Sequence, residues 1–193
     1  MSNPASMPLC YSSTAQLLII DAQERLAAAM SPDELARVET NMLRLVTAAK
    51  ILNIPIITTE HNSAGLGKTI SKVREQLPAQ VVATEKSCFS CCTAAGFERN
   101  LTNEPKRKQV VMVGMEAHIC IMQTASGLLR WGYQVFVAED AICSRHTTHR
   151  DNAIQRMRHA GIQIVNTESV AFEWVGDSNS ENFRAVWELF RHT

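Results

Sequence analysis

Apolar residues fall into two kinds of block along the chain, and these blocks predict strands and helices in alternation. Residues 16–21 form a continuous apolar run ending at Asp21, the pattern of a strand covered on both faces. Residues 31–52 carry apolar side chains at helical spacing and begin with Ser31 and Pro32, which favour a helix start. The same reasoning predicts strands over 54–59, 81–84, 109–114, 133–138 and 162–165, and helices over 93–101, 119–131, 148–160 and 181–190.

This alternation is typical of βαβ units, whose right-handed crossovers build a mostly parallel sheet with helices on both faces. We therefore predict an α/β protein, a three-layer αβα sandwich around a sheet of about six strands. The length of 193 residues fits one domain over residues 1–193, with a core over about 15–175 and a final helix over about 180–191.

The balance of charge narrows the possible partners. Lysine and arginine number 19, and aspartate and glutamate also number 19, so the chain lacks the basic surface that binds nucleic acid or anionic membranes. No apolar run reaches membrane-spanning length, and residues 1–16 lack the basic and apolar features of a targeting signal. We expect a cytoplasmic protein without nucleic-acid or membrane partners, and leave a mitochondrial location open.

The chain has six cysteines, which we expect to be free thiols because nothing in the sequence indicates secretion. Three of them, Cys88, Cys91 and Cys92, form a cluster that contains a CxxC spacing. A zinc site would need a second pair of ligands at suitable spacing, and the sequence has none. A thiol-redox role for this cluster stays open as a minor alternative.

Three reactive side chains follow predicted strands. Asp21 ends the first strand, Lys86 follows the third, and Cys120 follows the fourth at the start of a helix. Because ligands of parallel sheets bind beyond the carboxyl ends of the strands, we expect these residues to converge at one edge. The helix dipole and Lys86 would favour the thiolate of Cys120, so we expect a depressed thiol pKa, which Asp21 opposes. Asp21 could accept the thiol proton and return it to a leaving group.

Three segments resemble the signature blocks of the isochorismatase-like hydrolases, a superfamily that includes nicotinamidases and N-carbamoyl amidohydrolases. They are Leu18–Leu26, Thr84–Phe89 and Val113–Cys120, and the last is the most specific. The resemblance runs from about Leu17 to Phe172 and looks closest to the isochorismatase domain-containing proteins, whose substrates are largely undefined. It implies the Rossmann-like αβα fold of that superfamily.

Carried over residue by residue, the resemblance implies that Asp21 is the general base, Lys86 its electrostatic partner and Cys120 the nucleophile. It also implies a cis peptide bond between Met115 and Glu116. The backbone N–H groups of Glu116 and Cys120 would then form an oxyanion hole.

The chain departs from the nicotinamidases at the metal site that follows their second strand. That site has an Asp followed closely by His residues, whereas this chain has Glu60, His61 and Asn62 there. Neither a metal, nor another cofactor, nor nicotinamide hydrolysis is therefore implied. Gln23 and His61 remain candidates for contact with a small-molecule substrate.

The substrate class rests on Cys120. Isochorismatases themselves cleave a vinyl ether, which requires no thiol, so the thiol favours hydrolysis of a small amide or related C–N bond through a thioester. Two alternatives stay open: a vinyl-ether-cleaving hydrolase, and a catalytically silent member of the fold that acts as an interaction protein.

The resemblance also implies a homo-oligomer, a dimer or larger. Aromatic and apolar residues, which are favoured at interface cores, are frequent near the end of the chain, although they could equally cap the sheet of their own subunit. These residues are Phe172, Trp174, Phe183, Val186, Trp187 and Phe190.

Overall fold

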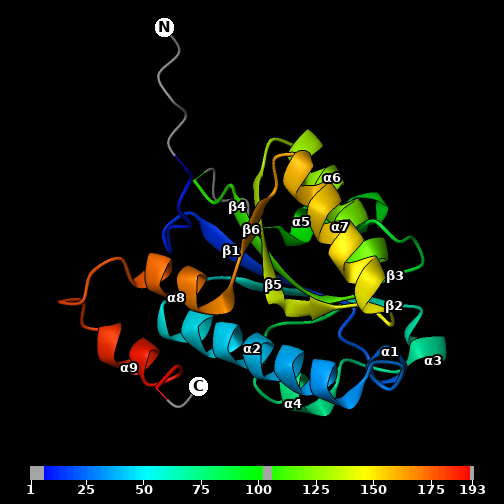
Figure 1. The fold of residues 1–193 in the computed structure, drawn as a ribbon, viewed down its shortest axis with the longest axis horizontal. Coiled ribbons are helices and arrows are strands. Elements are labelled where there is room, and N and C mark those ends of the chain that lie inside the picture. Colours follow the sequence, from blue (N-terminus) through cyan, green and yellow to red (C-terminus); the bar gives the residue numbers. More distant parts are fainter. Residues whose placement is uncertain (1–6, 102–105, 192–193) are drawn as a thin grey trace, which may run out of the picture.

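The computed structural model describes residues 7–101 and 106–191, and it confirms the predicted fold class. Six strands form one sheet in the order β3-β2-β1-β4-β5-β6, and every neighbouring pair is parallel (Figure 1). The strands are β1 (Ala15–Ile20), β2 (Ile56–His61), β3 (Thr84–Lys86), β4 (Gln109–Met115), β5 (Gln134–Cys143) and β6 (Gln163–Val165).

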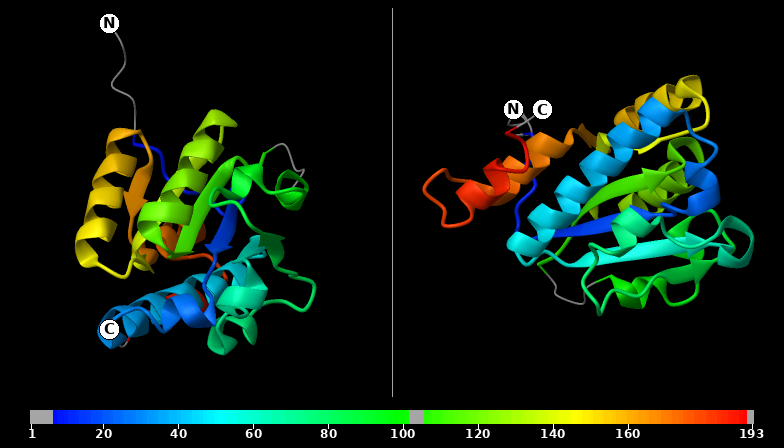
Figure 2. Two further views of the ribbon diagram at one scale, coloured as in Figure 1. Left: turned by 90° about the vertical axis from the view of Figure 1, so that its right-hand side faces the viewer. Right: turned by 90° about the horizontal axis from the view of Figure 1, so that it is seen from below.

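Helices cover both faces of the sheet and make the structure three layers deep (Figures 1 and 2). One face carries α2 (Pro32–Ile51), α8 (Thr167–Val175) and α9 (Phe183–Trp187). The other carries α5 (Phe97–Asn100), α6 (Met122–Arg130) and α7 (Thr147–His159). Three short helices lie in the connections that follow β1 and β2: α1 (Glu24–Ala27), α3 (Ser63–Leu66) and α4 (Ser71–Arg74).

The central strands are apolar throughout because both of their faces are buried. In β1, Leu17 and Ile19 pack into the layer of α2, while Leu18 and Ile20 pack into the layer of α6 and α7. All four side chains have zero exposure. This burial explains why a continuous apolar run marks a central strand of a parallel sheet.

Several element boundaries differ from those predicted. The strands predicted over 54–59 and 81–84 are found two or three residues later, as β2 and β3. β5 continues to Cys143, so that Asp140 lies inside the strand and not beyond its end. There the Asp140 carboxylate accepts hydrogen bonds from the backbone N–H and hydroxyl of Thr167, at 2.9 and 2.8 Å, and so holds the start of α8. No helix is predicted from the sequence where α8 lies.

The C-terminal aromatic residues pack mainly on their own subunit. Trp174, Val186 and Phe190 are buried in the apolar core that α2 shares, and Phe172 contacts the rings of both Phe183 and Phe190. Trp187 is 40% exposed. These residues therefore cap the sheet, and they give little support to an interface at this end of the chain.

Gly114 sets the separation of the two strands at the middle of the sheet. Its φ is +117°, and a Cβ atom there would lie 2.0 Å from the carbonyl oxygen of Ile20. Ile20 precedes Asp21, and Gly114 lies near the end of β4, which leads to Cys120. Since β2 lies on one side of β1 and β4 on the other, this is the point where a doubly wound sheet opens a crevice. Only glycine allows so close an approach here.

We expect Gly114→Ala to destabilise the protein by at least about 3 kcal/mol, because a backbone clash adds to the strain of a positive φ. For a chain of this size, that loss corresponds to a fall in melting temperature of roughly 6–12 °C. Gly132→Ala is the matched control: Gly132 has φ +79°, but a Cβ atom there would meet nothing within 4 Å. Equal melting temperatures for the two variants would contradict this account of Gly114.

Candidate active site

Asp21, Lys86 and Cys120 meet at the carboxyl edge of the sheet. The Lys86 Nζ atom lies 2.6 Å from Asp21 Oδ2 and 3.7 Å from Cys120 Sγ. The side chains of Asp21 and Lys86 have zero exposure, and Cys120 is 6% exposed. The structure thus brings together the three residues that the sequence analysis singled out.

Each of the three residues has a different local support. Asp21 directly follows β1 and has φ +48°, a backbone conformation that Asp tolerates better than most residues. Lys86 is the last residue of the edge strand β3, and its long side chain spans β2 to reach Asp21. Cys120 lies in a single π-helical turn, Ala117–Ile121, between β4 and α6. The Met115–Glu116 peptide bond that leads into this turn is cis.

Hydrogen bonds from neighbouring residues complete the environment of the ion pair. Thr59 Oγ1 donates to Asp21 Oδ1 at 2.7 Å, and Lys86 Nζ donates to the carbonyl oxygen of Cys88 at 3.2 Å. Thr59 is not among the site residues predicted from the sequence. In the sequence, Thr59 is marked only as a hydroxyl residue near the end of an apolar strand. Residues at such positions often take no part in catalysis.

The expected depression of the Cys120 pKa is wrong, because the structure gives the opposite direction. Burial raises the pKa of the thiol, and the charge of Asp21 raises it further, while Lys86 lowers it less than these two effects raise it. Burial is the largest single effect on Lys86 and lowers its pKa, but the charge and hydrogen bond of Asp21, together with Cys91 and Cys120, outweigh burial, and the Lys86 pKa is raised. The site at rest therefore holds a neutral thiol beside the 2.6 Å contact between Lys86 and Asp21.

A cavity of about 370 Å³ opens onto these residues, a size within the usual range for small-molecule sites. Its wall includes the ring of Phe89, stacked on His61 with centroids 5.5 Å apart. The cavity is lined by Asp21, Arg25, Leu26, Ala29, His61, Leu66, Phe89, Glu116, Ile119, Cys120 and Arg145. It thus holds the candidate base and nucleophile against a largely apolar wall.

Of the two candidate substrate contacts, His61 lines this cavity and Gln23 does not. Gln23 has zero exposure, and its amide is occupied by the backbone. It accepts a hydrogen bond from the His61 N–H at 2.7 Å and donates to the carbonyl oxygens of His61 and Gly67, at 3.1 and 2.7 Å. Gln23 therefore fixes the loop that carries His61, which makes it a positioning residue.

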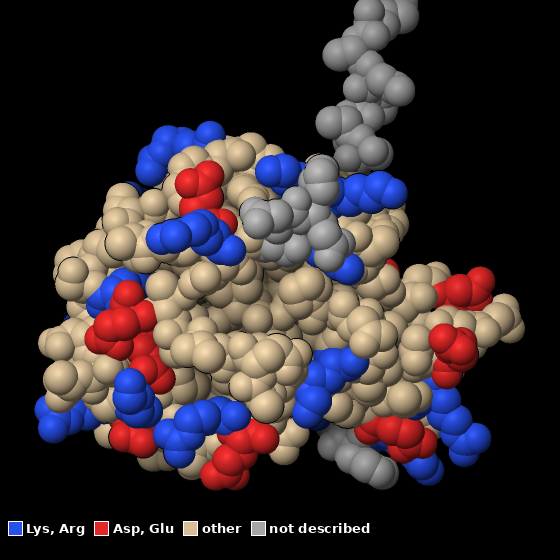
Figure 3. Space-filling model, turned by 180° about the vertical axis from the view of Figure 1, so that it is seen from behind, with Lys and Arg blue, Asp and Glu red and all other residues tan. Residues whose placement is uncertain are grey.

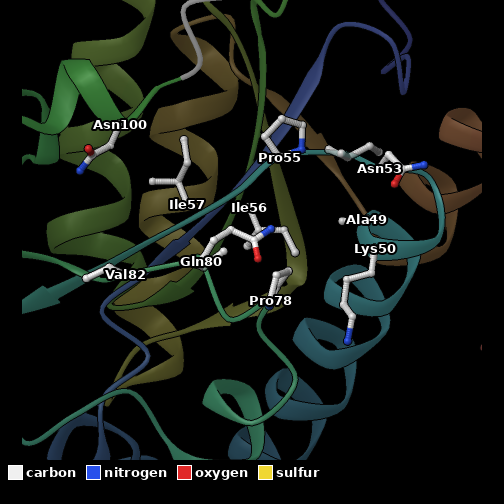
Figure 4. Close-up of a pocket in the computed structure, with 12 residues that line it drawn as sticks. Ala49, Lys50, Asn53, Pro55, Ile56, Ile57, Pro78, Gln80, Val82 and Asn100 are labelled. Atoms are coloured by element: carbon white, nitrogen blue, oxygen red, sulfur yellow. The ribbon is translucent and has the colours of Figure 1, made fainter.

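A second cavity, of about 590 Å³, lies by the amino end of β2 (Figure 4). Its walls come from the end of α2, from β2 and from the segment around Pro78–Val82, and Lys50 is its one charged residue. Among the described residues that line it, there is neither a thiol nor a carboxylate. Of these two cavities, the smaller one therefore holds the candidate nucleophile and base.

The described residues offer little support for a metal site or a redox cluster. Among residues 7–101 and 106–191, no group of three or more His, Cys, Asp or Glu side chains could hold a metal ion. Glu60 is already engaged, since it accepts hydrogen bonds from the backbone N–H and the hydroxyl of Thr69.

All six cysteines are free thiols, as expected. Burial raises the pKa of Cys91 to about 12 and that of Cys92 to about 11.

Comparison with known proteins identifies the family. The family model described as the isochorismatase domain matches residues 15–169. This chain belongs to the isochorismatase family. Isochorismatase domain-containing protein 2 of Danio rerio is 34% identical over 176 residues, which cover 91% of this chain and 86% of the relative. The secreted isochorismatase effector Isc1 of Phytophthora sojae is 35% identical over 150 residues, which cover 76% of this chain and 71% of the relative.

Solved structures of isochorismatase-like proteins share the whole fold. The MAR1 ribonuclease of Caenorhabditis elegans has a TM-score of 0.87 and 34% identity, over 94% of this chain and 92% of that one. YcaC of Pseudomonas aeruginosa, solved with hexane-2,5-diol and covalent acrylamide, has a TM-score of 0.85 and 26% identity over 97% and 93%. The YcaC gene product of Escherichia coli, described as an octameric hydrolase of unknown specificity, has a TM-score of 0.85 and 25% identity over 98% and 91%.

The raised pKa of Cys120 predicts how its alkylation depends on pH. Only the thiolate reacts, so below the pKa the rate constant should rise about ten-fold per pH unit, without levelling off between pH 7 and 9. Lys86→Met should slow the reaction further, because Lys86 lowers this pKa. Iodoacetamide labelling can be followed on the tryptic peptide of residues 109–130, in which Cys120 is the one cysteine. A plateau below pH 8 would show that the thiol is activated at rest.

Proposed function

We propose that this isochorismatase-family protein hydrolyses a small amide, or a related C–N bond, through a thioester on Cys120. One observation carries the proposal: a buried Asp21–Lys86 ion pair, 2.6 Å long, lies against the Cys120 thiol at the edge of a cavity. A nucleophile, a proton acceptor and a fixed positive charge within contact distance are what covalent acyl transfer requires.

The first step follows from the neutral resting thiol. Cys120 attacks the carbonyl carbon of the bound amide, and Asp21 accepts the thiol proton as the C–S bond forms. Lys86 remains charged beside Asp21 and stabilises the developing sulfur anion. Because burial holds the thiol neutral until a substrate arrives, a general base is needed at this step and not before it.

The negative charge then moves to the carbonyl oxygen of the substrate. We assign the backbone N–H groups of Glu116 and Cys120 as its hydrogen-bond donors, since both residues line the cavity at the turn that follows β4. Asp21 passes its proton to the leaving nitrogen, the C–N bond breaks and the thioester remains. Water, deprotonated by Asp21, then cleaves the thioester and restores the thiol.

The comparisons support this proposal in two ways. The Escherichia coli relative is described as a hydrolase, and the Pseudomonas aeruginosa relative was solved with covalent acrylamide, an amide that alkylates nucleophiles. An RNA substrate is suggested by the name of the Caenorhabditis elegans protein, which is described as a ribonuclease. On the face of the present chain that Figure 3 shows, however, Lys and Arg are interspersed with Asp and Glu. We therefore favour a small-molecule substrate over RNA.

Incubation with a panel of small amides and N-carbamoyl compounds should produce an acyl adduct on the 109–130 peptide. Cys120→Ala should abolish the adduct and the hydrolysis together. Asp21→Asn should lower the rate by about 10²–10⁴-fold, the usual contribution of a positioned general base. Full hydrolysis by Cys120→Ala would overturn the thioester mechanism.

Further substrates in the same panel test the alternatives. A vinyl ether that the Cys120→Ala variant cleaves would establish the isochorismatase-type reaction, in which Asp21 acts as the acid. Cleavage of a short RNA that persists in Cys120→Ala would place a nuclease activity elsewhere on the protein. A silent interaction protein would process none of these compounds and would form no adduct.

We also propose that the protein forms a homo-oligomer, supported by the octameric relative from Escherichia coli. The proposal concerns copies of this chain and no other macromolecule. Within the described residues, every helix is too short or too polar to span a lipid bilayer. Light scattering at micromolar concentration should give a mass of at least twice 21.4 kDa. A mass near 21.4 kDa would contradict the proposal.

A further inference from the structure

Once Lys86, which pairs with Asp21, is counted, the active-site cavity has one cation more than it has carboxylates. Four charged residues line the cavity: two carboxylates, Asp21 and Glu116, and two guanidinium groups, Arg25 and Arg145. Each carboxylate already has a cation of its own. Asp21 pairs with the buried Lys86 at 2.6 Å, and Glu116 Oε1 pairs with Arg145 Nε at 2.9 Å.

Arg25 is the cation left over. In the two stretches that the structure describes, no ion pair joins its guanidinium to a carboxylate. It lies on the short helix α1, four residues after Asp21, and it lines the same cavity as the Cys120 thiol. A molecule that places a carbonyl carbon at Cys120 therefore comes within the field of one unneutralised positive charge.

We propose that Arg25 makes this cavity select substrates that carry a compact anionic group, such as a carboxylate, on the same small molecule as the reacting amide. This inference rests on the proposed function and adds a substrate class to it. A guanidinium matches a carboxylate with two parallel hydrogen bonds, which gives geometric as well as electrostatic selection. Leu26, Leu66 and Ile119 supply an apolar wall for the body of such a molecule.

Arg145 is a weaker candidate for the same role. Glu116 already occupies its Nε atom, so an anion that binds there must compete with a carboxylate fixed by the fold. Within residues 7–101 and 106–191, no carboxylate pairs with Arg25 in this way. A neutral amide of equal size would leave Arg25 solvated and would gain nothing from it.

Two alkylating reagents of nearly equal size measure this selection without knowledge of the substrate. Iodoacetate is an anion and iodoacetamide is neutral, and the same thiolate attacks both and displaces iodide. The ratio of their rate constants at Cys120 therefore cancels any change in the thiol pKa. Both rate constants can be read from the 109–130 peptide of the full-length protein.

We expect Arg25→Gln to lower the iodoacetate-to-iodoacetamide ratio by about two- to five-fold, the effect of one partly exposed charge. Arg25→Lys, which keeps the charge, should return the ratio toward that of the unaltered protein. High salt should narrow the difference between Arg25→Gln and the unaltered protein, because it screens exposed charges. Arg156→Gln is the matched control: Arg156 is an exposed arginine on α7 outside the cavity, and its loss changes the net charge equally.

The possible outcomes separate the two proposals. Alkylation of Cys120 with the same ratio in Arg25→Gln, Arg156→Gln and the unaltered protein would overturn the anion subsite and leave the hydrolase proposal standing. If neither reagent labelled Cys120, Cys120 would not be an accessible nucleophile. That result would overturn both the hydrolase proposal and the anion subsite. A lowered ratio confined to Arg25→Gln, in a variant with an unchanged circular dichroism spectrum, would establish the subsite.

Discussion

The buried ion pair between Asp21 and Lys86 is the interaction on which the rest of the site depends. Removing two charges from water costs several kcal/mol for each ion, and their attraction offsets this cost only where other groups complete the geometry. Here Thr59 and the carbonyl group of Cys88 do so, at 2.7 and 3.2 Å. Breaking such a pair by removing one partner typically costs about 3–5 kcal/mol, so each charge holds the other in the dry site.

The sheet makes this pair possible because its parallel strands all end at one edge. Asp21 follows the central strand β1, while Lys86 ends the edge strand β3, and β2 lies between them. A lysine side chain is long enough to span that strand, whereas a shorter cation would not be. On the other side of β1, Gly114 allows β4 to approach closely, and the turn that follows β4 brings Cys120 to the pair. The parallel strand ends and the close approach of β4 to β1 therefore shape both the fold and the site.

These constraints explain what could be predicted from the sequence and what could not. The alternation of strands and helices and the convergence of the three residues depend on apolar runs and on where they end, both of which are visible in the sequence. The predicted limits of β2 and β3 differ from those observed because these strands reach into polar residues such as His61 and Lys86. The sign of the Cys120 pKa shift was wrong because desolvation depends on how many atoms cover the thiol. The role of Arg25 could not be predicted from the sequence, because only the folded structure shows which carboxylates lie near its guanidinium group.

The neutral thiol and the excess positive charge fit one physical scheme. An anionic substrate brings negative charge toward Cys120, which would oppose the formation of a thiolate, as Asp21 already does. A substrate carboxylate paired with Arg25 would be neutralised before the sulfur attacks, so Asp21 and Lys86 would have to accommodate only the charge of the reaction itself. Every carboxylate in the occupied cavity would then have its own cation: Lys86 for Asp21, Arg145 for Glu116, and Arg25 for the substrate.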